Sequence, residues 1–75
     1  MTRTPGDPAV TIVLNGEERQ AAEGTSVLAL LKSIGLPPGR VAVEVNGSVI
    51  RRADYPGLAL RERDRIEVVH FVGGG

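Results

Sequence analysis

The fold is decided by residues 24–35, Gly-Thr-Ser-Val-Leu-Ala-Leu-Leu-Lys-Ser-Ile-Gly, the one stretch of the chain that has the period of a helix. Thr25 or Ser26 can cap the first turn, and Gly35 can end the helix in a left-handed conformation. We therefore expect one amphipathic helix, which buries the apolar face formed by Val27, Leu28, Leu30, Leu31 and Ile34.

A β-hairpin is predicted on each side of this helix. The first joins residues 10–14 to a short polar edge strand at residues 18–21, and the second joins residues 41–45 to residues 48–50. Each hairpin turns on an Asn-Gly pair, the residues that best tolerate the positive φ angles of a tight turn. The chain therefore begins as strand, strand, helix, strand, strand.

A fifth strand is predicted at residues 66–69, after an irregular segment at residues 51–60 that contains a short turn or a single helical turn. Because a helix lies between the two hairpins, it must cross one face of a mixed sheet, with the first and last strands adjacent and parallel in the middle. The prediction is an α+β fold of the β-grasp, or ubiquitin-like, type. Its expected core consists of Ile12, Leu14, Val27, Leu28, Leu31, Ile34, Val43, Val45, Leu60, Ile66 and Val68.

Composition limits the possible functions. A chain of 75 residues forms one domain, and its nine basic and nine acidic residues cancel, which argues against nucleic acid or a membrane as the main partner. The chain has no cysteine, so it offers no disulfide or thiolate metal site and is expected in the cytoplasm. No apolar stretch is long enough for a membrane helix.

Three glycines, Gly73, Gly74 and Gly75, follow the last predicted strand. Glycine has no Cβ, so such a tail can enter a channel too narrow for side chains and present its carboxylate to another protein's active site. The alternative is a frayed end without a role. We expect a flexible leader at residues 1–8, a β-grasp domain at residues 9–72 and a flexible glycine tail at residues 73–75.

Several motifs, taken in order, resemble one known family. They are Asn-Gly-Glu at residues 15–17, Gly-Thr-Ser-Val at 24–27, Val-Ala-Val-Glu-Val-Asn-Gly at 41–47, Val-Ile-Arg-Arg at 49–52, Asp-Arg-Ile-Glu-Val-Val at 64–69 and the glycine tail. Together they resemble the ThiS sulfur carrier proteins of thiamin biosynthesis, from about residue 10 to residue 75. In one departure, Arg63 stands where the family usually has glycine, so the local turn is expected to differ because a left-handed conformation is strained for arginine.

The resemblance implies a reaction cycle at the Gly75 carboxylate. A ThiF-type adenylyltransferase would use ATP and Mg²⁺ to form an acyl-adenylate, and sulfur from a cysteine desulfurase would replace AMP to give a thiocarboxylate. A ThiG-type thiazole synthase would then take the sulfur. The chain itself would be a carrier and not an enzyme, with no bound cofactor, no metal and no catalytic residue, and would be a monomer when free.

Partner binding is expected on the sheet face opposite the helix. If Ile66 and Val68 point inward, the two-residue period of a strand points the residues between and after them outward. The candidate docking residues are Val13, Ala42, Val69, Phe71 and Val72. His70 is expected to be mainly a strand-end residue, with positioning of the tail or a partner contact as the alternative.

Three rival functions remain open. The small subunit of molybdopterin synthase is a β-grasp domain with the same terminal chemistry, but it tends to be longer between the helix and the third strand. A ubiquitin-like modifier would be joined through Gly75 to lysines of other proteins, although Lys32 is the only lysine here. An interaction module with an inert tail is the third.

Overall fold

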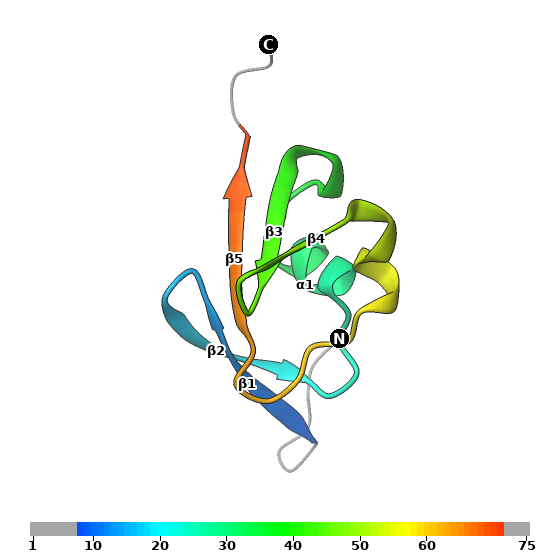
Figure 1. The fold of residues 1–75 in the computed structure, drawn as a ribbon. Helices are drawn as coiled ribbons and strands as arrows, with labels where there is room; N and C mark the ends of the chain where they lie inside the picture. Colours follow the sequence, from blue (N-terminus) through cyan, green and yellow to red (C-terminus); the bar gives the residue numbers. More distant parts are fainter. Residues whose placement is uncertain (1–7, 72–75) are drawn as a thin grey trace.

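The computed structural model describes residues 8–71, which form a five-stranded mixed sheet with one α-helix packed on one face (Figure 1). The strand order is β2-β1-β5-β3-β4, and β1 and β5 are parallel neighbours. This arrangement confirms the predicted β-grasp fold. The elements are β1 (Ala9–Leu14), β2 (Glu17–Ala22), α1 (Val27–Ser33), the 3-10 helix η1 (Pro38–Arg40), β3 (Val41–Val45), β4 (Ser48–Ile50), the 3-10 helix η2 (Arg52–Gly57) and β5 (Arg65–His70).

Both hairpins turn where the Asn-Gly pairs predict. The φ angles of Asn15 and Gly16 are 49° and 83°, and those of Asn46 and Gly47 are 52° and 85°. Positive φ at both central residues defines a type of tight turn whose twist matches that of the flanking strands. The second turn pairs Val45 with Ser48, and β2 lies at the edge of the sheet as expected.

Helix α1 begins and ends as its sequence indicates. The Ser26 side chain caps the first turn by accepting a hydrogen bond of 3.0 Å from the amide N–H of Ala29. After the helix, Gly35 takes a φ of 78°, and the amide of Leu36 donates to the carbonyl of Leu31 at 2.9 Å. A left-handed glycine followed by this bond satisfies carbonyls that the last turn would otherwise leave unpaired.

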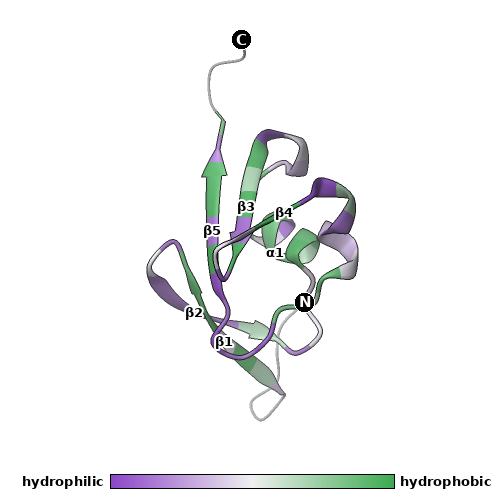
Figure 2. Cartoon of the chain, viewed as in Figure 1, coloured by the Kyte–Doolittle hydropathy of each residue, from purple (hydrophilic) through white to green (hydrophobic). Residues whose placement is uncertain are grey.

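The core lies between α1 and the sheet, and Figure 2 shows hydrophobic residues on α1 and on β1, β3 and β5. Eight of the predicted core residues are buried, whereas Leu28, Ile34 and Val45 are only partly buried and pack against the core. Leu30, which was predicted on the buried face of the helix but left out of the core list, is also buried, as are two residues that the list lacked, Val41 and Tyr55.

Tyr55 has the largest side chain of these residues, and only 2% of it is exposed. It lies in η2, which packs against α1. Two backbone bonds fix the segment after η2 beside the start of the helix, from Val27 N–H to the Leu58 carbonyl at 2.9 Å and from Leu60 N–H to the Thr25 carbonyl at 2.8 Å. The irregular segment is thus part of the core layer.

The turn that leads into β5 keeps a left-handed residue although that residue is arginine. Arg63 has a φ of 69°, and its amide donates to the Thr11 carbonyl at 2.7 Å. Asp64 closes the same turn by accepting from the amide of Arg61 at 2.8 Å. These bonds hold Arg63 in the left-handed conformation in spite of its cost to a residue other than glycine.

Candidate docking face and tail strand

Strand β5, which leads toward the glycine tail, is held from both sides by the two turn asparagines. On the β1 side, the Asn15 amide side chain accepts from the Val68 N–H at 2.8 Å and donates to the Val68 carbonyl at 3.2 Å. On the β3 side, the Asn46 side chain accepts from the Arg65 N–H at 2.9 Å and donates to Asp64 at 2.9 Å. The hairpin turns therefore also fix the position and direction of β5.

The far end of β5 is tied to the sheet through Phe71, whose amide donates to the Arg40 carbonyl at 2.8 Å. In Figure 1, β5 rises past the end of β1 toward the C-terminal end of the chain, with β3 beside it. His70, the last residue of the strand, is exposed and pairs with Val41, as expected of a strand-end residue.

The sheet face opposite α1, here called the outer face, carries the predicted docking residues that the structure describes. Val69 and Phe71 are 59% and 56% exposed. Ala42 is directly opposite Val69 on β3, and Val13 is beside Arg65 on β1; both are partly buried. Val72 lies outside the described residues.

These residues do not form one apolar cluster. Val13 and Ala42 flank β5 at Arg65 and Val69, four residues apart, which is about 13 Å along a strand. Charged side chains occupy the face between them, so Val13 is separated from the Ala42–Val69 pair.

One exposed apolar residue of the outer face was missed. Val49 is 75% exposed and is directly opposite Glu44. The position of Val49 was predictable from the sequence, because a two-residue turn at Asn46-Gly47 that pairs Val45 with Ser48 also pairs Glu44 with Val49.

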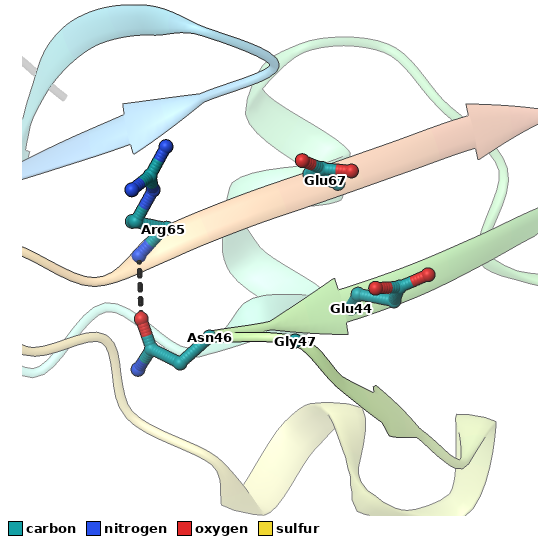
Figure 3. A pocket seen from close by; sticks show the side chains of 5 residues that line it. All are labelled: Glu44, Asn46, Gly47, Arg65 and Glu67. Carbon is teal, nitrogen blue, oxygen red and sulfur yellow. Dashed lines mark hydrogen bonds between the residues drawn. The ribbon is translucent and has the colours of Figure 1, made fainter.

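The centre of the outer face is acidic. Glu44 and Glu67 are directly opposite each other on β3 and β5, and Figure 3 shows their side chains near one another while that of Arg65 extends toward β1. These three residues, with Asn46 and Gly47, line a hollow of about 360 Å³. Within residues 8–71, no cation forms an ion pair with either carboxylate.

Among the residues that the structure describes, no three His, Asp or Glu side chains gather in a way that could hold a metal ion. No helix in this part of the chain is long and apolar enough to cross a membrane. The predicted reactive residue Gly75, with Gly73 and Gly74, lies outside the described residues.

A five-stranded mixed sheet under one crossing helix, with a central strand leading to a glycine tail, defines a ubiquitin-like β-grasp protein. The model of the ThiS family matches residues 12–75. The sulfur carrier protein ThiS of Bacillus subtilis is 41% identical over 63 residues, which cover 83% of this chain and 96% of that protein. The chain belongs to the ThiS family.

A solved structure agrees with this assignment. The crystal structure of the thiamine biosynthesis protein ThiS from Geobacter metallireducens is 29% identical in sequence and has a TM-score of 0.74, covering 88% of this chain and all of that one.

The chain also resembles part of longer proteins. It is 50% identical over 64 residues to the thiazole synthase of Magnetococcus marinus, a match that covers 85% of this chain and 20% of that protein. A thiazole synthase of Paramagnetospirillum magneticum matches with 39% identity over the same share. The chain therefore spans about a fifth of the length of these two relatives.

Proposed function

We propose that this chain is a sulfur carrier for the thiazole of thiamin, and that the sulfur is carried as a thiocarboxylate on Gly75. The observation that carries the proposal is the family match, which runs through residue 75 and so includes the glycine tail. A relative named as a sulfur carrier, similar over nearly its whole length, supports the same role.

The chemistry explains why the carrier needs partners. A carboxylate is a poor electrophile, so a ThiF-type adenylyltransferase would first join the Gly75 carboxylate to the α-phosphate of ATP, with Mg²⁺, and release pyrophosphate. Sulfur at the level of hydrosulfide then attacks the carbonyl carbon, so that a C–S bond forms and the C–O bond to AMP breaks. Where a cysteine desulfurase delivers the sulfur as a persulfide, the terminal sulfur forms the C–S bond as AMP leaves. A thiol of the partner proteins then attacks the inner sulfur, so that the S–S bond to the carried sulfur breaks, the thiocarboxylate is released and the two partner thiol groups end as a disulfide.

The carrier contributes reach and direction. Strand β5 is bonded on both sides up to Val68, which fixes the direction of the strand that precedes the tail. Glycines at positions 73 and 74 have no side chain to obstruct a narrow channel. The outer face, with Val69 and Phe71 exposed at the C-terminal end of β5, is the surface we propose for the adenylyltransferase.

We further propose that a ThiG-type thiazole synthase accepts the sulfur. Segments similar to this chain occur within two proteins named thiazole synthase, which supports a functional link between the two activities. Because the cycle consumes ATP, we propose that it runs in the cytoplasm.

The test is the intact mass of the full-length protein after incubation with the adenylyltransferase, ATP, Mg²⁺ and a cysteine desulfurase. The untreated protein first shows whether Gly75 carries the terminal carboxylate. A gain equal to replacing one oxygen by sulfur, localised to Gly75, is expected, and a variant lacking Gly74 and Gly75 should show none.

An unchanged mass with an adenylyltransferase that is active on another carrier would contradict the proposal. Adducts with lysines of other proteins would instead indicate a modifier. Transfer of the sulfur to a molybdopterin precursor and not to thiazole would indicate the molybdopterin synthase subunit.

A further inference from the structure

The edge of β5 that faces β1 has an open hydrogen-bonding position at His70. Backbone groups along a strand point alternately to its two neighbours. Toward β3, the Arg65 carbonyl accepts from the amide of Asn46 at 2.7 Å, and the Phe71 amide donates to Arg40 at 2.8 Å. Residues 65 and 71 therefore show that odd-numbered residues of β5 bond to β3.

Even-numbered residues of β5 bond to the other side. The Ile66 carbonyl accepts from the amide of Asn15 at 2.8 Å, and both backbone groups of Val68 bond to the Asn15 side chain. Since β1 ends at Leu14, that side chain takes the place of the next strand residue. The next even-numbered position, His70, thus directs its N–H and C=O away from β3 and past the end of β1.

No other residue in the range 8–71 hydrogen-bonds these two groups of His70. A donor and an acceptor side by side on a strand edge match the backbone of another extended chain. The side chain of His70 is exposed and takes no part in this pattern. The open position therefore suits recognition that does not depend on the identity of residue 70.

We propose that the His70 edge of β5 accepts an extended backbone segment of the adenylyltransferase, which pairs with His70 as an added strand. This inference rests on the proposed function. The added strand would continue the pairing that Asn15 ends at Val68, so that β5 is bonded on both sides up to the residue before Phe71. Pairing at His70 requires the partner's segment to be extended and to lie beside the C-terminal end of β5.

The first test removes the N–H of residue 70 without removing a bond to β3. Proline is tolerated in a strand where its missing N–H would face solvent, and it favours an extended residue before it. His70→Pro should bind the adenylyltransferase about tenfold more weakly, the loss expected when a buried acceptor of the partner is left unpaired. His70→Ala should bind within about twofold of wild type, because it keeps the backbone.

The affinities can be measured by calorimetry, with circular dichroism and thermal unfolding to confirm that both variants are folded. Wild-type affinity for a folded His70→Pro variant would overturn the inference. An equal loss in His70→Ala and His70→Pro would also overturn it, because it would assign recognition to the side chain.

Hydrogen exchange gives a second test that needs no variant. In the free protein the His70 amide should exchange fast, whereas that of Val69, which bonds to β3, should be protected. In the complex the His70 amide should become protected at least tenfold. An unchanged His70 exchange rate, or protection already present in the free protein at high concentration through pairing of two copies, would overturn the inference.

The two proposals fail separately. If wild-type protein gains no sulfur mass, the sulfur-carrier function fails. If it gains sulfur mass while the His70 amide stays unprotected in the complex, only the added strand is refuted.

Discussion

Glu44 and Glu67 lie directly opposite each other on β3 and β5, and both are exposed on the outer face. Like charges at directly opposite positions of an antiparallel pair destabilise the sheet. Since no cation within residues 8–71 forms an ion pair with either carboxylate, no ion pair in this part of the chain offsets the repulsion. A protein partner with a basic group at this site would supply one.

Glu67→Gln should therefore raise the free energy of unfolding by about 0.5 kcal/mol at low salt. The gain should shrink as the salt concentration rises, because exposed charges are screened. Urea unfolding at two salt concentrations measures both effects. Glu23→Gln, at an exposed position after β2, is the matched control and should change little; an equal gain there would assign the effect to net charge.

Arg63→Gly should also stabilise the domain. A left-handed conformation costs a non-glycine residue about 1–2 kcal/mol, and the extra freedom of glycine in the unfolded chain returns about 0.5–1 kcal/mol of that. The expected net gain is about 0.5–1 kcal/mol, measured by chemical unfolding. Arg61→Gly, in the same turn but at a position without positive φ, should destabilise, and a gain in both variants would show that strain at Arg63 is not the cause.

The Asn15 side chain should contribute to stability beyond its role in the turn. Asn15→Gly keeps a residue that accepts positive φ but removes two hydrogen bonds to Val68. At about 1 kcal/mol for each bond, we expect a loss of about 1–2 kcal/mol and faster exchange of the Val68 amide. Gly16→Asn, which changes the same turn but leaves Asn15 in place, separates the two effects, since it should leave the Val68 amide protected.

The fold was predictable because each local signal agreed with the topology. The two Asn-Gly turns, the Ser26 cap and Gly35 fixed the element boundaries to within a few residues. Tyr55 was not predictable in the same way. It lies in a 3-10 segment with Pro56, where neither the helical nor the strand period assigns a face, so its burial depends on how η2 packs against α1.

The candidate site was predicted less completely than the fold. Strand alternation placed Val69 on the outer face, but it gives no distance between strands, so the separation of Val13 from Ala42 needed the register of β5 with its two neighbours. The bonds from the Asn15 side chain to Val68 cross 53 residues of sequence, and no local pattern indicates them.

Val69→Asp should weaken binding of the adenylyltransferase without unfolding the domain. Val69 is more than half exposed, so the change costs little in the free protein, but it replaces an apolar contact of the proposed interface by a carboxylate. We expect about a tenfold loss of affinity by calorimetry, since burying an unpaired charge is costly. Ala29 is exposed on α1, on the other side of the sheet, so Ala29→Asp should bind as wild type. An equal loss of affinity in Ala29→Asp would contradict the assignment of the outer face as the docking surface.

Gly75→Ala should slow adenylation severely while leaving the fold intact. A Cβ next to the reacting carboxylate narrows the paths by which the tail can enter a channel, and displacements of about 1 Å at a reacting group can cost about a hundredfold in rate. Release of pyrophosphate by the adenylyltransferase measures the step. Gly57→Ala is a suitable control because a Cβ there meets no atom within 4 Å and its φ is not positive, so it should be adenylated at the wild-type rate. A wild-type rate for Gly75→Ala would show that the partner's channel accepts a side chain at this position, and the terminal glycine would then not be required for the chemistry.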